Sequence, residues 1–192
     1  EDGKGAWIAQ LLRGKRCVAI AGNDAHGNFN RFRQIGIPFF RIAEDDRQLF
    51  GRVRTGVYSR NKTESGLLNA QVQGHSIMTD GPVANLSGLE EESFLGKIVK
   101  TGSRVLITSL SSAEFGSIRT VKVFKGVRGS QNETIEAAWY PSSAFQFSEE
   151  LELQCDEAGY FRVEVETNPG DRDGTSHLCL TNPVWCSSTG VL

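Results

Sequence analysis

Hydrophobic and polar residues follow two different periods, and the change falls near residue 82. In the first part, apolar residues recur with the spacing of one helical face before Gly14, a residue that commonly ends helices. These apolar residues are Ala6, Trp7, Ile8, Leu11 and Leu12. The pattern predicts an amphipathic helix at the start of the chain.

A short continuous apolar run, Cys17–Val18–Ala19–Ile20–Ala21, follows this helix. Continuous apolar runs are typical of strands buried on both faces, as in a parallel sheet covered by helices. The polar loop at residues 22–28 comes next, and active sites of α/β folds lie where strands end in such loops. The sequence therefore predicts an α/β unit with a candidate site after this strand.

A second helix is predicted further along, with Thr63 as its N-cap and Gly74 as its stop. Leu67, Leu68 and Val72 form its apolar side. A strand-like run at residues 75–78 and a turn at residues 79–82 close this part of the chain.

Short alternating runs separated by Gly, Ser, Asn and Pro characterise the rest of the chain. They cover residues 104–110, 118–124, 134–139, 151–155, 160–165 and 176–180. Such a series predicts a β-sandwich, with an immunoglobulin-like topology as the expected form. The predicted division is an α/β segment at 1–82 and a β-sandwich domain at 83–192.

Composition narrows the classes of function. Hydrophobic residues make up 39% and charged residues 23%, which is typical of a folded globular chain. The net charge of −2 comes without a long basic stripe, so we expect no nucleic-acid partner. There is no apolar run long enough to cross a membrane, so we expect no membrane partner.

The first residue is not Met, and we expect the sequence to be an internal part of a longer chain. The compartment is not assigned; a secreted or periplasmic location is compatible with the sequence.

Asp24 and His26 form the most informative motif of the polar loop. In an extended loop, residues two apart point to the same side, so a carboxylate and an imidazole can share one ion. This donor pair suits Zn, Mn or Fe. The competing interpretation is a turn-forming aspartate beside a surface histidine.

The run GNDAHGN at 22–28, after a helix and an apolar strand, resembles the last metal-binding motif of the PHP (polymerase and histidinol phosphatase) family. Residues 54–82, ending in the turn TDGP, are similar to the segment that closes the barrel in the branch related to carbaryl hydrolase. His75 and Asp80 stand where that branch commonly has Arg and Asn. The run at 180–185, LTNPVW, resembles the end of the β domain in the same branch.

The resemblance implies a metal-dependent phosphoesterase or related hydrolase with the C-terminal portion of a PHP-type α/β barrel. Asp24 and His26 would be its metal ligands, Asp24 bridging a metal or orienting the attacking water. Arg31 and Arg33 would contact a substrate phosphate, with solvated loop charges as the alternative.

The metal site is expected to be incomplete in this chain. A catalytic metal needs about three protein ligands plus an open position, and the motif supplies two. The other two histidines, His75 and His177, fall in strand-like runs and are expected to be structural. We therefore expect no activity from the chain alone, and we expect the missing ligands to come from the N-terminal part of the barrel or from another chain.

Two further interpretations stay open. The chain can be a non-catalytic β-sandwich module for carbohydrate or protein, or a structural domain that completes its parent; a homo-oligomer is also compatible with the sequence. For the module, the candidates for an aromatic platform are Trp139, Tyr140, Phe145 and Phe147, although we expect them to lie in the core.

The cysteines leave two possibilities open. Cys155 and Cys179 can form a disulfide if their strands are neighbours; four free thiols are the alternative.

Overall fold

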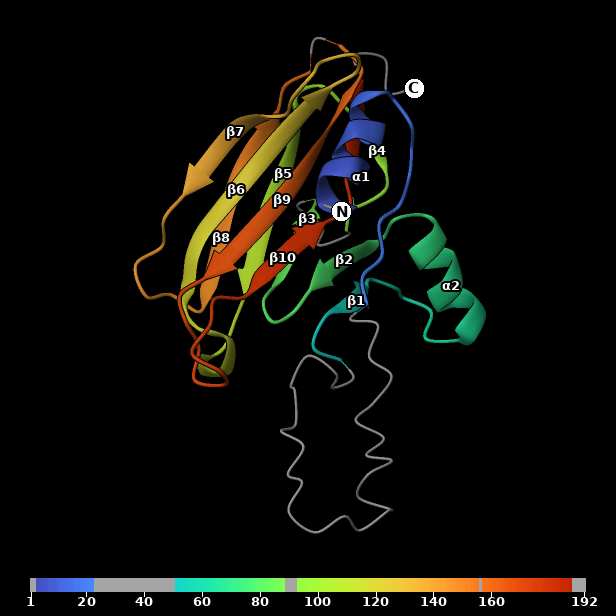
Figure 1. Ribbon diagram of the computed structural model, residues 1–192. Helices are drawn as coiled ribbons and strands as arrows, with labels where there is room; N and C mark the ends of the chain where they lie inside the picture. Colours follow the sequence, from blue (N-terminus) through green and yellow to red (C-terminus); the bar gives the residue numbers. More distant parts are fainter. Residues whose placement is uncertain (1–2, 23–50, 89–92, 156, 188–192) are drawn as a thin grey trace.

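The computed structural model describes residues 3–22, 51–88, 93–155 and 157–187. Within these ranges the protein is mostly antiparallel β-structure, with two helices outside the strands (Figure 1). The helices are α1 (Gly3–Leu12) and α2 (Glu64–Val72). The first strands are β1 (Arg54–Val57), β2 (Ser76–Thr79), β3 (Val83–Ser87), β4 (Ile98–Lys100) and β5 (Ser103–Leu110). The others are β6 (Ile118–Val127), β7 (Thr134–Trp139), β8 (Gln146–Leu153), β9 (Gly159–Thr167), β10 (Leu178–Thr181) and β11 (Val184–Ser187).

The strands form two sheets that share one core. The larger sheet has eight strands and runs β1-β2-β10-β9-β11-β4, with β6 on the other side of β9 and β7 next to β6. The smaller sheet is β3-β5-β8. Buried side chains from both sheets form a single cluster, so the predicted β-sandwich is confirmed in this part of the chain. Strands β1 and β2, from the first 82 residues, belong to the same sheet as β10.

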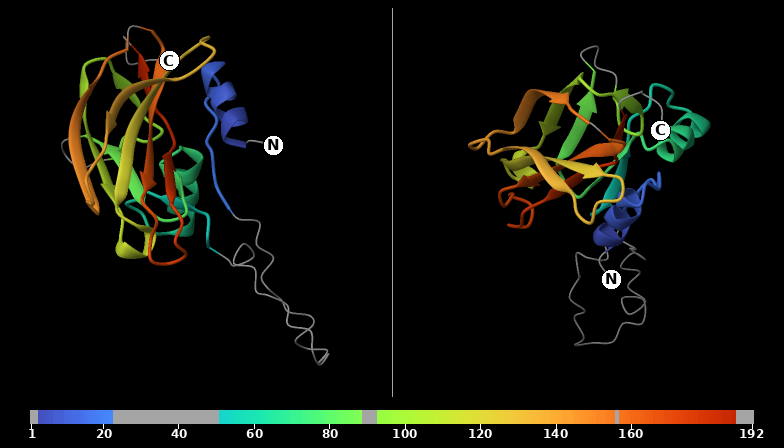
Figure 2. Two further views of the ribbon diagram at one scale, coloured as in Figure 1. Left: turned by 60° about the vertical axis from the view of Figure 1, so that its left-hand side comes forward. Right: turned by 90° about the horizontal axis from the view of Figure 1, so that it is seen from above.

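Strand β9 is the centre of the larger sheet, and its two faces differ in chemistry. Phe161, Val163 and Val165 point into the core, as their two-residue period predicts. The alternate residues, Tyr160 and Arg162 among them, point to the opposite face, where α1 lies (Figure 2). A covering helix on the outer face is why both sets of side chains are buried.

A buried ion network fastens α1 to this outer face. Arg162 is only 1% exposed and donates to Glu133 and Glu164, while Lys4 of α1 pairs with Glu164 at 2.6 Å. Tyr160 donates its hydroxyl to Glu133 at 2.8 Å. Burial lowers the pKa of Arg162, but the hydrogen bonds and charges of the two glutamates outweigh it and leave the pKa raised. The guanidinium therefore stays charged and ties α1 to β9.

The disulfide joins Cys155, which follows β8 of the smaller sheet, to Cys186 in β11 of the larger sheet. The alternative of pairing Cys155 with Cys179 is wrong, because Cys179 lies in β10 with its side chain in the core as a free thiol. Burial raises the pKa of Cys179 to about 12, so this thiol stays protonated.

Both helices end where the sequence predicts, and α2 also begins at its predicted N-cap, but the burial of the two helices differs. Thr63 caps α2 by accepting a hydrogen bond from the Gly66 N–H, and Gly14 and Gly74 have φ values of +82° and +79° after the two helices. The apolar side of α1 is buried through Leu11 and Leu12. The expected apolar side of α2 is not buried, because Leu67, Leu68 and Val72 are 42%, 55% and 76% exposed. No helix in the described ranges is long and apolar enough to span a bilayer.

Candidate functional site

The four residues proposed from the sequence as site residues, Asp24, His26, Arg31 and Arg33, lie outside the described residues. What the structure describes is the segment that leads into them. Residues 15–22, which we call the approach segment, run in extended form from the end of α1 across the outer side of the larger sheet (Figures 1 and 2).

Side chains from α1, β1 and the end of β10 hold the approach segment at alternate residues. The Ala19 N–H donates to Asn182 Oδ1 and Asn182 Nδ2 donates to the Ala19 carbonyl, both at 2.9 Å. The Thr55 hydroxyl accepts from the Ala21 N–H at 2.8 Å and donates to the Ala21 carbonyl at 3.0 Å. Trp7 Nε1 donates to the Cys17 carbonyl at 3.0 Å. The chain is thus fixed in place three residues before Asp24.

The other edge of the segment carries no partner in the described part of the chain. Backbone groups of Val18 and Ile20 alternate with those of Ala19 and Ala21, and none of them has a hydrogen bond to a described residue. Their side chains are 38% and 63% exposed. The prediction of a strand buried on both faces is therefore wrong within the described residues. There the segment pairs with none of the strands, and side chains rather than a neighbouring strand form its hydrogen bonds.

Asn182 connects the approach segment to β2 through its side-chain hydrogen bonds. It is fully buried, and besides Ala19 it donates to the Ser76 carbonyl and hydroxyl at 3.2 Å and 2.9 Å. Asn182 belongs to the LTNPVW run, whose asparagine follows β10. In the sequence this run stands out only by resemblance, and the contact with a segment 163 residues away is visible in the structure alone.

Replacing Thr55 with valine is expected to remove the clamp on Ala21 while keeping the side-chain shape. We expect a loss of about 1 kcal/mol in the free energy of unfolding, because two hydrogen bonds to a half-buried backbone are lost. Hydrogen exchange read out by mass spectrometry should show faster exchange in residues 19–22. Thr63→Val in the N-cap of α2 is a control, which should leave exchange in that segment unchanged. Equal exchange in wild type and Thr55→Val would contradict the clamp.

The two described histidines occupy different environments. His75 is half-buried and lines a cavity with Lys97 between α2 and the sandwich. His177 is 2% exposed just before β10, with Asp80 Oδ2 3.5 Å from its Nδ1 and Asp173 Oδ1 3.5 Å from its Nε2. Its ring also meets the Phe115 ring at 5.3 Å. The carboxylates lie on opposite sides of the imidazole, so these three residues do not converge on one ion.

Asp173 is held from several sides. The Thr175 hydroxyl and N–H donate to it, and these bonds, followed by the charges of His177 and Arg52, lower the pKa of its carboxyl. Asp80 accepts from the Leu178 N–H at 2.6 Å. Sequence spacing gave no indication of this cluster, because Asp80 lies far along the chain from the other two residues. The contacts indicate a structural role in joining the β2–β3 turn to the β9–β10 loop.

Within the described ranges, no group of three or more His, Cys, Asp or Glu side chains can hold a metal ion. The donor set of Asp24 and His26 suits a divalent metal chemically, but two ligands do not complete a site. No catalytic step through a metal is derived from these residues.

The aromatic residues at the β7–β8 connection do not share one surface. The Trp139 and Phe147 rings pack at 5.4 Å and contact the core, as expected for sandwich residues. Tyr140 and Phe145 are exposed. Since Trp139 points inward, Tyr140 next to it points outward, and the four residues form no single platform.

Comparison with models of known families, with curated proteins and with solved structures found no match to this chain in any of the three.

Proposed function

We propose that this chain is the C-terminal part of a metal-dependent phosphoesterase or related hydrolase of the PHP type, and that it contributes Asp24 and His26 to a divalent-metal site. In this proposal the chain combines the closing portion of an α/β barrel with an immunoglobulin-like sandwich. The remaining ligands come from another segment, either an upstream part of a longer chain or a partner chain. Arg31 and Arg33 contact the phosphate ester.

One observation carries most of the argument. The strand-like segment before the D-x-H motif is hydrogen-bonded to the larger sheet and its loops at Ala19 and Ala21. Val18 and Ile20 have exposed apolar side chains and a backbone edge without a partner among the described residues. An open apolar strand edge is costly in a finished fold. Its natural complement is a neighbouring strand, which adds both backbone hydrogen bonds and apolar cover.

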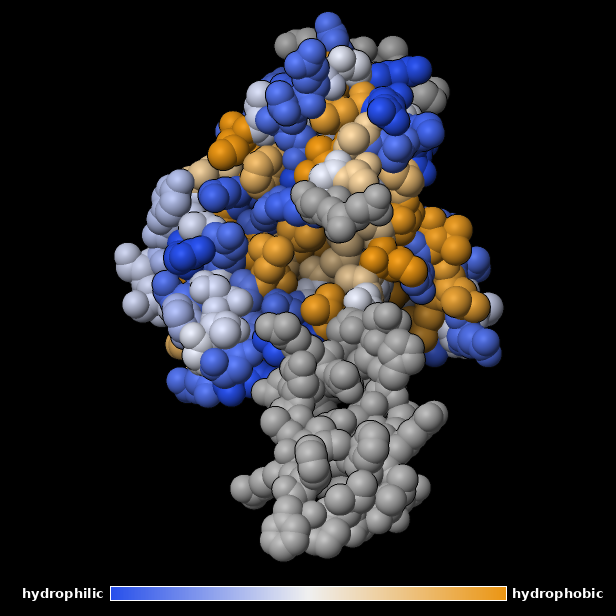
Figure 3. Space-filling view, in the orientation of Figure 1, coloured by the Kyte–Doolittle hydropathy of each residue, from blue (hydrophilic) through white to orange (hydrophobic). Residues whose placement is uncertain are grey.

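A second surface supports the same proposal. The outer side of α2 exposes Leu68 and Val72, and Val72 lines a cavity together with Val18. Figure 3 shows hydrophobic surface over α2. A strand with its helix, added at this edge, would cover both surfaces at once. This is the arrangement by which α/β units repeat.

Metal content tests the proposal. We expect the purified chain, dialysed against Zn²⁺, Mn²⁺ or Fe²⁺, to retain metal only weakly, because two ligands bind less tightly than three or four. Retention measured by inductively coupled plasma mass spectrometry should fall to the background level in Asp24→Ala/His26→Ala. His75→Ala is a control that should leave it unchanged.

A phosphodiesterase assay tests whether the chain is inactive alone, separately from whether Asp24 and His26 are metal ligands. The chain alone should not hydrolyse bis-p-nitrophenyl phosphate. Metal retention that is equal in wild type and Asp24→Ala/His26→Ala would contradict the assignment of these two residues as metal ligands. Turnover by the isolated chain that survives in the double variant would show that the chemistry lies elsewhere.

A further inference from the structure

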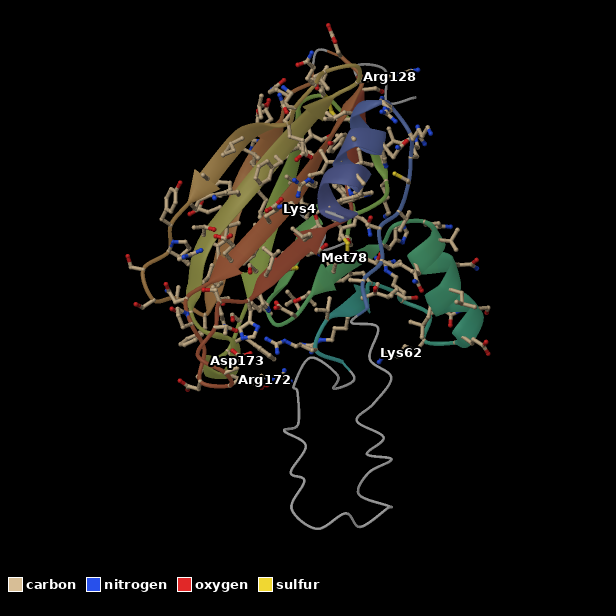
Figure 4. All side chains as sticks on the ribbon, viewed as in Figure 1. Lys4, Lys62, Met78, Arg128, Arg172 and Asp173 are labelled. Carbon is tan, nitrogen blue, oxygen red and sulfur yellow. A yellow bond between two sulfur atoms is a disulfide. The ribbon has the colours of Figure 1, made fainter. Side chains whose placement is uncertain are left out.

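An apolar hollow lies between α1, the approach segment and the outer face of the larger sheet. It has a volume of about 350 Å³, and Trp7, Ile20, Met78, Leu178 and Leu180 are among its lining residues. Figure 3 shows hydrophobic surface in this region of the front face, and Figure 4 labels Lys4 on α1 and Met78 on β2, which are both lining residues. The hollow is separate from the cavities lined by His75.

The floor of the hollow has an unusual composition for an outward sheet face. Leu180 pairs with Met78 in the β2–β10 ladder, and Leu178 lies two residues away, so all three point to the same face. Outer faces of antiparallel sheets normally carry polar residues. Here α1 covers the neighbouring part of the face, over Tyr160 of β9, and leaves these three side chains as the floor of an open hollow.

The polar groups around the hollow are already engaged by the protein. Lys4 pairs with Glu164, Asp80 accepts from the Leu178 N–H, and the Thr79 hydroxyl donates to the Pro82 carbonyl. A ligand therefore gains little from carrying a charge. It gains from apolar contact with Trp7, whose indole is held in place by the Cys17 carbonyl.

We propose that this hollow is a binding site for a small uncharged compound with an aromatic or branched apolar group. Its volume lies in the range of small-molecule sites, about 300–1,000 Å³, and it is too small for a helix of a partner, which is about 10 Å across with its side chains. Ala21 and Val53 also line it, and Ala21 lies three residues before Asp24 of the D-x-H motif. The site itself needs no metal.

Binding of N-phenyl-1-naphthylamine, a neutral dye that becomes fluorescent in apolar sites, tests this proposal. The titration is run on the full chain after treatment with EDTA, so that its outcome is independent of the metal site. We expect saturable binding with one dye per chain, at a midpoint that does not change with protein concentration. Energy transfer from tryptophan to the dye should decrease in Trp7→Phe, because Trp7 lines the hollow, while Trp139 and Trp185 remain as donors.

A matched pair of variants locates the dye. Ile20→Lys places an ammonium at the rim of the hollow and should weaken binding about tenfold or more. Val72→Lys makes the same kind of change at an exposed apolar residue on α2, outside the hollow, and should leave binding unchanged. Both positions are exposed, so both variants should keep the wild-type unfolding midpoint. No saturable binding by the wild type, or an equal loss in the two variants, would overturn the proposal.

Discussion

Arg162→Met should lower the free energy of unfolding by about 3 to 5 kcal/mol, because it leaves Glu133 buried without its cation and leaves Glu164 with Lys4 as its remaining cationic partner. The side chains of these glutamates are 6% and 10% exposed, so water replaces the lost partner poorly. The guanidinium also lies over the rings of Phe124 and Trp7, at 4.6 Å and 5.8 Å. Urea denaturation followed by circular dichroism measures the loss.

Two further variants separate the buried charge from general packing. Lys4→Met removes a partly exposed cation that also pairs with Glu164, and its cost should stay within about 1 kcal/mol. The double variant Arg162→Met/Glu133→Gln should cost less than the sum of the two single variants, because the second change removes the uncompensated charge. A loss of less than about 1 kcal/mol for Arg162→Met would show that the network contributes little to the fold.

Loss of the disulfide is the second large effect. Cys155→Ala/Cys186→Ala is expected to destabilise the chain by about 3 to 4 kcal/mol, from the entropy that the unfolded chain regains when a loop of 31 residues is opened. The two sulfur atoms lie in the shared core and link the smaller sheet to the larger one, so the double variant also loses packing between the sheets.

Reductant provides the control for the disulfide. Tris(2-carboxyethyl)phosphine should lower the urea midpoint of the wild type toward that of the double variant. It should leave the midpoint of the double variant unchanged, because Cys17 and Cys179 are already free thiols. A wild-type midpoint that is insensitive to reductant under unfolding conditions would contradict a stabilising disulfide between Cys155 and Cys186.

The strands that were predictable are those with a clear two-residue period, whereas β3, β4 and β11 fall in none of the predicted runs. Val121, Val123 and the alternate residues of β9 follow the two-residue spacing of strands with one face in the core, and the structure places them there. The same spacing could not reveal that the other face of β9 is buried as well. Arg162 and Glu164 are buried because Lys4 and Trp7 of α1 lie over them.

The candidate site shows where local pattern is insufficient. The apolar run at Cys17–Ala21 predicts a strand buried on both faces, and the structure instead holds it by side-chain hydrogen bonds along one edge, with Val18 and Ile20 exposed. The pairing of Cys155 was likewise open, because three other cysteines were available to it and the sequence carries no record of which strands face each other. Contacts such as that of Asn182 with Ala19 join residues 163 positions apart and follow no periodicity.

The sequence by itself determined the two helices with their capping residues, the series of short strands and the D-x-H motif, because all of these depend on neighbours within a few residues. The tertiary structure alone decided the order of the strands, the disulfide, the burial of Arg162 and the hollow beside α1. These depend on which distant faces meet, and that choice is made by the burial of apolar surface over the whole chain.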